Sequence, residues 1–422
     1  MTQEQGRTER AVLVGLELSQ GQQWPVEESL AELAELVRTA GGEVVTEVIQ
    51  RRGAPEPATL IGTGKVAEVK AVVEDLEADI VVFDDELSPA QLRNLEEALA
   101  VKVLDRTQLI LDIFAQRARS REGKLQVELA QLQYLLPRLA GMGTVLSRLG
   151  GGIGTRGPGE TKLEVDRRRI RTRIRDLRRE LNKVVAQREV LRQERSRNQV
   201  PVVALVGYTN AGKSTLLNAL TGSEEVYAAN QLFATLDPTM RAVDLAGVRR
   251  VIISDTVGFI RKLPHTLVAA FRATLEEVVE ADVILHVVDV AHPNYPQQME
   301  AVFEVLEDLG AAGKPTITAF NKRDLLPQEQ GENIAARYHQ AVSISAVTGE
   351  GLEELEQLLL EAIPQQLIQG VFLVPYSEAG VVEQMHQWAR VIREEYTEAG
   401  IQLELEVDPV WNSRWQSFAQ GK

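Results

Sequence analysis

The sequence lacks cysteine altogether and has only five histidines. The missing thiols exclude disulfide bonds, thiolate zinc sites and a cysteine nucleophile, and their absence is typical of cytoplasmic proteins. His286 lies inside the apolar run 283–290, where we expect a buried core histidine and not a metal ligand. No run approaches the roughly 18 apolar residues of a membrane span, and the first residues lack the apolar centre of a signal peptide. We therefore expect a soluble cytoplasmic protein with no membrane partner.

Length and charge indicate several domains with unlike surfaces. At 422 residues the chain exceeds the roughly 100 to 200 residues of a typical domain. Its formal net charge of −15 by itself disfavours a nucleic-acid partner. The segment 165–197, however, holds 13 Lys and Arg against 5 Asp and Glu. A strongly basic element is therefore set within an acidic protein.

Residues 1–109 alternate short apolar runs with amphipathic helical runs. This order is typical of a small parallel α/β domain. The expected strands cover residues 11–18, 43–50, 79–83 and 101–104, and the expected helices cover 25–40, 65–77 and a run opened by Ser88-Pro89.

Residues 110–198 carry two long helical patterns with narrow apolar seams. The first belongs to a helical stretch over 106–139 and the second covers 161–197. Each repeats apolar residues in steps of three and four, as in helices that pack along one face. The seams are Leu125, Leu129, Leu132, Leu136 and Leu139, and Ile170, Ile174, Leu177, Leu181, Val184 and Leu191. The segment 141–159 between them holds eight glycines. We predict an antiparallel helical hairpin with a glycine-rich tip, its second helix about 50 Å long.

Residues 199–366 alternate strand and helix again, which predicts a doubly wound α/β domain. Its expected strands cover residues 200–206, 249–255, 282–289, 315–320 and 341–345. Residues 367–422 predict a small α+β module, with strands over 371–374 and 401–407 and a helix over 381–396.

A phosphate-loop motif lies between the first strand of the doubly wound domain and the helix that follows. Its residues are Gly207, Tyr208, Thr209, Asn210, Ala211, Gly212, Lys213 and Ser214. Backbone amides of such a loop wrap phosphates, the lysine reaches the β- and γ-phosphates, and the serine hydroxyl binds Mg²⁺. The strand, loop and helix context makes a structural glycine turn a poor alternative.

Two further motifs end later strands. In Asp255, Thr256, Val257 and Gly258, the aspartate can hold Mg²⁺ through water and the Gly258 amide can contact a γ-phosphate. In Asn321, Lys322, Arg323 and Asp324, one carboxylate can accept both the N1–H and the 2-amino group of guanine, a donor pair that adenine lacks. Asn321 can tie this segment to the phosphate loop, and the backbone of Ser345, Ala346 and Val347 can cover the base edge. The predicted substrate is GTP.

A switch segment is expected between the first two motifs. It contains Phe233, Ala234, Thr235, Leu236 and Asp237. Either Thr235 or Thr239 can supply a second hydroxyl to Mg²⁺, and we favour Thr235. The expected catalytic groups are Lys213, Thr235 and Gly258, and the expected metal ligands are Ser214 and Thr235.

One part of the usual hydrolytic machinery is missing. Many GTPases place a water-orienting glutamine directly after the glycine of the second motif, but this chain has Phe259 there. A phenyl ring cannot orient water by hydrogen bonds, so slow intrinsic hydrolysis and stimulation by a partner are expected. Asn210 motivates a second hypothesis, that K⁺ bound beside the loop supplies positive charge; equal hydrolysis rates in Na⁺ and K⁺ would refute it.

Several segments outside these motifs resemble the HflX family of ribosome-associated GTPases. They are Ile61-Gly62-Thr63-Gly64-Lys65, Asp105-Arg106-Thr107, Glu128-Leu129-Ala130-Gln131-Leu132 and the glycine-rich run from Gly151 to Thr161. The resemblance covers about residues 12–363. It implies binding to the large ribosomal subunit and its rRNA, and GTP-dependent splitting or rescue of stalled ribosomes under stress. The candidate RNA contacts are Arg148, Arg156, Lys162, Arg167, Arg168 and Arg169.

Other interpretations stay open at this stage. The chain is alternatively a GTPase of RNA modification, RNA remodelling or large-subunit maturation, or a nucleotide-gated regulatory module. The basic helix is alternatively a solvated coiled-coil face. Family members have been linked to ATP use, but Gly62-Thr63-Gly64-Lys65 lacks full phosphate-loop spacing, and a turn before a helix is the better interpretation. We expect a monomer.

Overall fold

The computed structural model describes residues 8–19, 24–139, 162–197, 200–222, 232–233, 235, 239–246, 249–262, 272–327, 333–363, 368–407 and 414–419. Across these ranges, no helix is long and apolar enough to cross a membrane.

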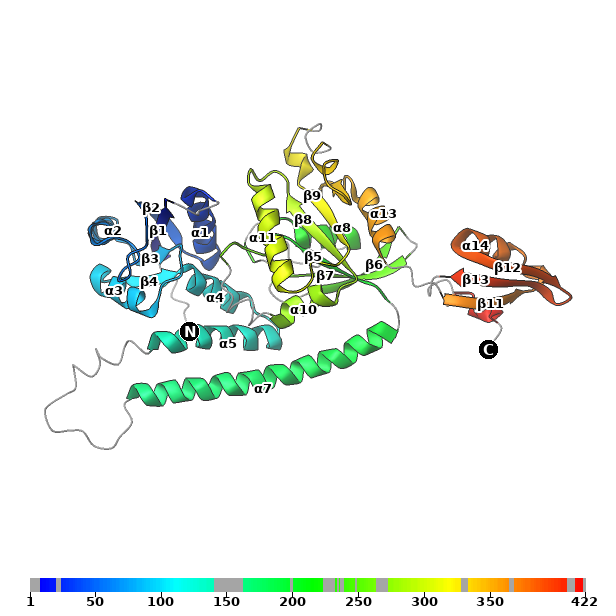
Figure 1. The fold of residues 1–422 in the computed structure, drawn as a ribbon, viewed down its shortest axis with the longest axis horizontal. Helices are drawn as coiled ribbons and strands as arrows, with labels where there is room; N and C mark the ends of the chain where they lie inside the picture. Colours follow the sequence, from blue (N-terminus) through cyan, green and yellow to red (C-terminus); the bar gives the residue numbers. More distant parts are fainter. Residues whose placement is uncertain are drawn as a thin grey trace, which may run out of the picture.

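The N-terminal part is a parallel sheet covered by helices on both faces, as predicted (Figure 1). Its strands, in the order β2-β1-β3-β4, are β1 (Arg10–Leu18), β2 (Glu43–Arg52), β3 (Ile80–Phe83) and β4 (Lys102–Asp105). Helices α1 (Val26–Ala40) and α4 (Arg106–Arg117) cover one face, and α2 (Thr63–Asp75) and α3 (Pro89–Leu99) cover the other. Successive side chains of β1 enter the two cores alternately, Leu13 on the α1 side and Val14 on the α2 side.

The expected helical stretch over 106–139 is two helices, so this prediction is wrong in part. Helix α4 ends at Arg117, and α5 (Arg121–Arg138) begins after Ser120, whose hydroxyl accepts a 2.8 Å hydrogen bond from the Gly123 amide. Such N-caps start a new helix and let the chain change direction.

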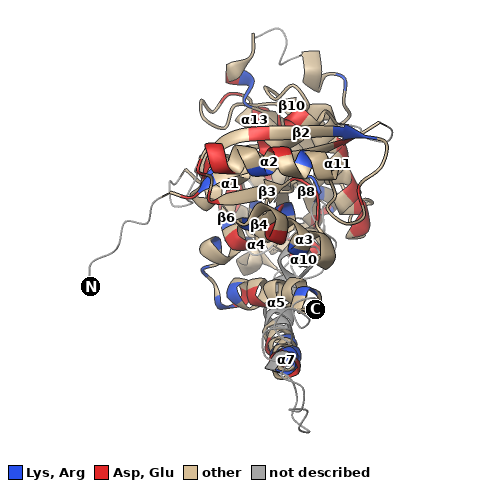
Figure 2. Cartoon of the chain, turned by 90° about the vertical axis from the view of Figure 1, so that its left-hand side faces the viewer, with Lys and Arg blue, Asp and Glu red and all other residues tan. Residues whose placement is uncertain are grey.

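Helix α5 pairs with the 36-residue helix α7 (Lys162–Arg197), and the two lie below the N-terminal sheet (Figure 2). Leu125, Leu129, Ile174 and Leu177 form the centre of their contact. Its edges are Leu132, Leu136, Ile170 and Leu181. The predicted pairing of the two seams is confirmed for these eight residues.

The central domain has the predicted doubly wound architecture. Its sheet order is β10-β9-β8-β5-β7-β6, with the parallel strands β5 (Val202–Val206), β7 (Arg249–Asp255), β8 (Val283–Asp289), β9 (Thr316–Asn321) and β10 (Ala341–Ser343). The antiparallel edge strand β6 (Thr239–Leu245) is an element that the sequence analysis missed. Helices α8 (Lys213–Thr221) and α13 (Leu352–Ala362) cover one face, and α10 (Arg272–Glu280) and α11 (Tyr295–Asp308) cover the other.

The C-terminal module corrects another prediction. The expected helix over 381–396 stops early: α14 (Gly380–Trp388) is followed by the edge strand β12 (Ala389–Thr397). The strand β13 (Gly400–Val407) lies between β12 and β11 (Ile368–Val374) in an antiparallel sheet. A bulge between Val391 and Arg393 breaks the two-residue alternation that would have indicated a strand.

Candidate active site

The phosphate loop connects β5 to α8 and passes close to two neighbouring strands. Gly212 has φ +94°, which favours glycine, and a Cβ there would collide with the Asn321 side chain. A Cβ at Gly207 would likewise collide with the Val287 carbonyl of β8. Only glycine allows these approaches, so both positions are fixed by packing as well as by backbone conformation.

Three oxygen-bearing side chains meet beside the loop. The Ser214 hydroxyl donates to Asp255 Oδ2 at 2.7 Å, and the Thr235 hydroxyl donates to the same oxygen at 2.9 Å. Ser214 Oγ and Thr235 Oγ1 are 2.9 Å apart. Asp255 Oδ1 is buried and has no hydrogen-bond partner in the described part of the chain. Hard oxygen ligands of this kind suit Mg²⁺, so the residues present fit the predicted metal.

Burial shifts the pKa values of the two charged side chains beside the loop, Asp255 and Lys213. It raises the pKa of the Asp255 carboxyl, although Lys213 and the two hydroxyls oppose the rise. It lowers the pKa of the Lys213 ammonium to about 8, against the influence of Asp255. Lys213 Nζ donates to the carbonyl oxygens of Gly207 at 3.1 Å and Tyr208 at 2.8 Å. A cation held inside the loop by backbone oxygens is available to an incoming phosphate.

Asn321 joins the base-selecting motif to the loop in the predicted manner. Its Nδ2 donates to the Ala211 carbonyl at 2.9 Å, and its Oδ1 accepts from the Ala346 amide at 2.9 Å. Lys322 pairs with Asp289 at 2.6 Å, Asp324 is exposed, and Val347 is 78% exposed. One amide side chain thus connects three segments that are far apart in sequence.

The predicted switch segment is described only in part. Thr235 lies beside Ser214 and Asp255, whereas Thr239 begins β6 and lies opposite Asp255 in the strand pairing. Phe233 packs edge-to-face on Phe114 of α4, with 4.7 Å between ring centroids. Ala234, Leu236 and Asp237 lie outside the described residues.

A buried ionic network joins the nucleotide loop to the N-terminal domain, and sequence reasoning missed it. Arg106 is 1% exposed and pairs with Glu32 and, at 2.6 Å, with Asp84. The Tyr208 hydroxyl donates to Glu32 and accepts a 2.9 Å hydrogen bond from the Arg261 amide. The motif Asp105-Arg106-Thr107 was visible in the sequence, but its partners come from distant elements.

Lys262 extends this network to the segment that follows Gly258. It has φ +55° and pairs with Asp84 and, at 2.6 Å, with Asp85. Burial alone would raise the pKa of the Asp84 carboxyl, but Arg106 and Lys262 lower it below its usual value. These charges therefore hold the segment that follows Gly258 against the N-terminal domain.

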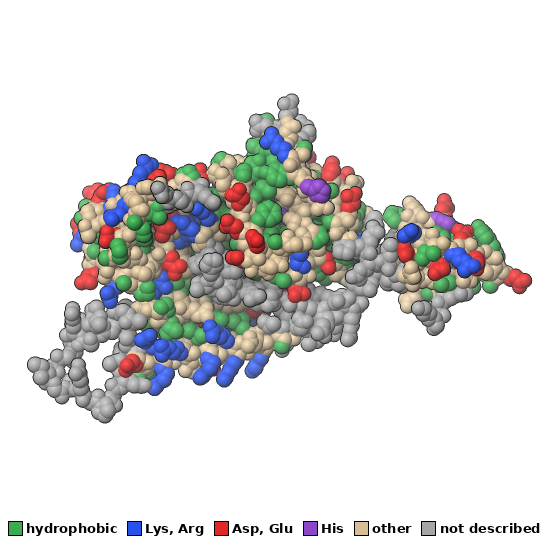
Figure 3. Space-filling view, viewed as in Figure 1, with side chains coloured by type: hydrophobic (Ala, Val, Ile, Leu, Met, Phe, Trp, Pro, Cys, Tyr) green, Lys and Arg blue, Asp and Glu red, His purple; other side chains and the backbone are tan. Residues whose placement is uncertain are grey.

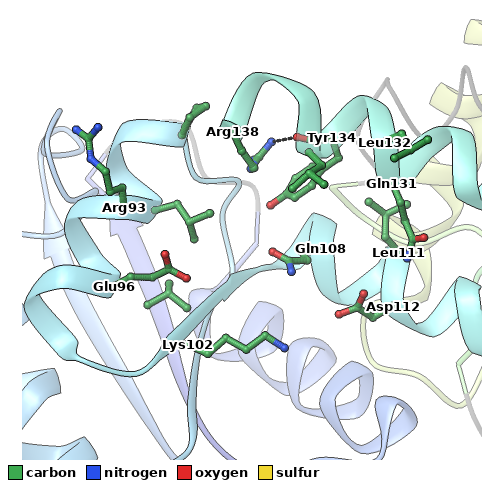
Figure 4. A pocket seen from close by; sticks show the side chains of 14 residues that line it. Arg93, Glu96, Lys102, Gln108, Leu111, Asp112, Gln131, Leu132, Tyr134 and Arg138 are labelled. Carbon is green, nitrogen blue, oxygen red and sulfur yellow. Dashed lines mark hydrogen bonds between the residues drawn. The ribbon is translucent and has the colours of Figure 1, made fainter. Parts of the chain in front are cut away.

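The helical hairpin is anchored to the same domain at the C-terminal end of α5. Arg138 donates to Asp105 at 3.2 Å and to the Leu87 carbonyl at 2.8 Å. It also donates to the Tyr134 carbonyl at 3.0 Å (Figure 4). Beside these contacts, a cavity of about 460 Å³ separates α5 from α3 and β4. Asp105 therefore holds the end of α5 against the N-terminal domain, and it directly precedes Arg106 of the buried ionic network.

The candidate RNA contacts are only partly described. Arg148 and Arg156 lie outside the described residues, and Lys162 begins α7 but its side chain is not described. Arg168 and Arg169 are exposed, and Arg167 is half-buried. Lys and Arg side chains form a row along the outer edge of α7 (Figure 3).

A doubly wound sheet with a phosphate loop after its central strand, and with a motif of the predicted guanine-selecting type tied to that loop, is typical of the P-loop GTPases. Family models match in the same order as the parts of the fold. A GTP-binding GTPase N-terminal model covers residues 27–115, a GTP-binding GTPase middle-region model covers 117–195, and a 50S ribosome-binding GTPase model covers 202–322.

Curated relatives indicate to which family of P-loop GTPases the chain belongs. GTPase HflX of Caldanaerobacter subterraneus subsp. tengcongensis is 51% identical, over 97% of this chain and 94% of the relative. GTPase HflX of Escherichia coli K12 is 46% identical, over 94% and 93%. A solved GTP-binding protein of Sulfolobus solfataricus in complex with GDP is 25% identical over 84% of this chain and 99% of the other, with a TM-score of 0.45. The chain belongs to the HflX family, and it is a GTPase.

Proposed function

We propose that the protein binds the large ribosomal subunit and uses its N-terminal domain and helical hairpin to split or rescue stalled ribosomes. The nucleotide state controls binding and release. The observation that carries the proposal is the surface of α7, where exposed cations follow one another over several turns: Arg168, Arg169, Arg171, Arg173, Arg175, Arg178, Arg179 and Lys183. A cationic row of this length suits the phosphates of rRNA, and the matched 50S ribosome-binding model points to the same partner.

The nucleotide site is proposed to work as follows. Gly258 and Lys213 contact the γ-phosphate, and Asp324 selects guanine. Ser214 and Thr235 hold Mg²⁺, which would neutralise charge on the β- and γ-phosphates when bound. Contacts of Tyr208 and Lys262 with Glu32 and Asp84 support a coupling between this site and the N-terminal domain.

The test is GTP hydrolysis with and without isolated large subunits, for the wild type and two triple variants. Arg171→Gln, Arg175→Gln and Arg178→Gln together remove charge from α7. Arg38→Gln, Arg51→Gln and Arg390→Gln remove the same charge elsewhere. We expect strong stimulation of the wild type and the control, and its loss in the α7 variant, with each lost phosphate contact reducing the log–log salt slope of binding by about 1.

The physiological task is tested separately, by sedimentation of 70S particles incubated with the protein and GTP. Appearance of free subunits supports splitting. Absence of stimulation by large subunits, or stimulation by free RNA of equal size, would overturn the proposal and favour RNA remodelling.

A further inference from the structure

The hydroxyl of Thr209 is buried at the nucleotide loop without any described role. Thr209 is 7% exposed, and its Oγ1 has no hydrogen-bond partner among the residues that the structure describes. Burying a hydroxyl without a partner costs free energy. A threonine that accepts this cost inside an active site suggests that its hydroxyl serves a bound group.

The other hydroxyls described at this site are engaged. Ser214 and Thr235 donate to Asp255, and Thr256 donates to the Leu205 carbonyl at 2.6 Å. The Tyr208 hydroxyl bonds Glu32 and the Arg261 amide. Among these hydroxyls, Thr209 Oγ1 is therefore the one that has no hydrogen-bond partner in the described structure.

Thr209 also lies beside the residue expected to contact the γ-phosphate. A Cβ added at Gly258 would come within 2.9 Å of Thr209 Cα and within 3.0 Å of both Thr209 Cγ2 and Lys213 Nζ. The Thr209 amide donates to the Phe259 carbonyl at 2.8 Å, and the Phe259 amide donates to the Gly207 carbonyl at 3.0 Å. This pairing holds Thr209 in register with the segment that follows Gly258.

Phe259 occupies the position that usually holds the water-orienting glutamine, and its side chain packs into an apolar cluster. Phe259 is 3% exposed and belongs to an apolar cluster shared with Phe114 and Ile110 of α4. Thr209, in contrast, lines a cavity of about 440 Å³ between the loop and α1, together with Asn210 and Glu32. The cavity has room for several water molecules at about 30 Å³ each.

We propose that Thr209 is a catalytic residue of GTP hydrolysis, whose hydroxyl orients the attacking water in place of the glutamine that Phe259 replaces. A hydroxyl can accept one hydrogen bond from the water and donate one to a γ-phosphate oxygen. The water oxygen bonds to the γ-phosphorus while the bond from that phosphorus to the β–γ bridging oxygen breaks. GDP keeps the electron pair, both water protons leave on the released phosphate, and Thr209 retains its own proton.

The experiment measures single-turnover GTP hydrolysis, nucleotide affinity and thermal stability of the full chain without ribosomes, so it does not depend on the proposed partner. Thr209→Val keeps the shape and removes the hydroxyl, and Thr209→Ser keeps the hydroxyl. Ser343→Ala is the matched control, because Ser343 Oγ is also buried without a described partner but lies in β10.

Removing an orienting hydrogen bond should slow Thr209→Val by about 10- to 100-fold. Its GTP and GDP affinities should change little, and its melting temperature should be equal or higher, because an unsatisfied buried hydroxyl is gone. Thr209→Ser should recover most of the rate, and Ser343→Ala should hydrolyse GTP like the wild type.

Three results would overturn the proposal: a wild-type rate in Thr209→Val, an equal loss in Thr209→Ser, or a loss of affinity in Thr209→Val that matches its loss of rate. The last two would assign Thr209 a packing role, since a purely structural threonine affects binding and stability together.

Discussion

At the scale of single residues, the site depends on side chains whose chemistry admits few substitutes. Asp324 is exposed, and Asn321 of the same motif bridges the Ala211 carbonyl and the Ala346 amide. The proposed guanine specificity depends on the two acceptor oxygens of a carboxylate, which would face two donors of the base. Exposure also means that Asp324 can be changed without disturbing a core.

Asp324→Asn should therefore exchange base preference and leave the fold intact. An amide offers one acceptor and one donor group, which matches xanthine, where a carbonyl oxygen replaces the 2-amino group of guanine. We expect GTP affinity to fall at least about 30-fold, because an unmatched polar pair at the base costs roughly 1–3 kcal/mol for each group, and XTP affinity to rise. Titration with fluorescent analogues of both nucleotides checks this. Unchanged GTP affinity would mean that Asp324 does not read the base.

At the scale of elements, the helical hairpin shows that the burial of a contact determines how strongly the contact stabilises the fold. Leu177 of α7 is 0% exposed in the seam with α5. Arg173 of the same helix forms a bidentate ion pair with Glu128 at 2.6 and 2.7 Å, yet both side chains are at least 40% exposed. Apolar burial, and not the ion pair, is therefore expected to hold the two helices together.

Leu177→Ala and Arg173→Ala compare these two contributions directly. The first should lower the free energy of unfolding by about 2–5 kcal/mol, because it removes buried methyl groups and leaves a cavity. The second should lower it by at most about 1 kcal/mol, because water screens the exposed pair. Urea denaturation followed by circular dichroism measures both. A larger effect of Arg173→Ala would reverse this ranking.

At the scale of the whole molecule, Arg106 connects two domains that the sequence separates. Its guanidinium is buried between Glu32 and Asp84, and those carboxylates also bind Tyr208 and Lys262 of the GTPase domain. Removing one partner of a buried ion pair leaves the other charge uncompensated.

Arg106→Met should therefore cost about 3–5 kcal/mol and uncouple the two domains. Calorimetry should show the N-terminal domain unfolding at a lower temperature than the GTPase domain. Arg51→Met, which breaks an exposed pair with Glu17, should leave the profile unchanged. A single transition at the wild-type temperature in Arg106→Met would show that the network does not hold the domains together.

The sequence by itself determined the four parts of the fold, the heptad seam and the nucleotide motifs. These depend on local periodicity, or on particular residue types at fixed spacing after a strand, and such signals do not need the rest of the chain. Tertiary structure decided the division of the stretch 106–139, the strand β12 and the contacts of Tyr208, Arg106 and Lys262. Their partners lie far away in sequence, or a bulge hides their period, so only packing brings them together. Thr209 combines both: the motif fixes its position, and the folded chain places its Cα and methyl group beside Gly258 and leaves its hydroxyl buried without a described partner.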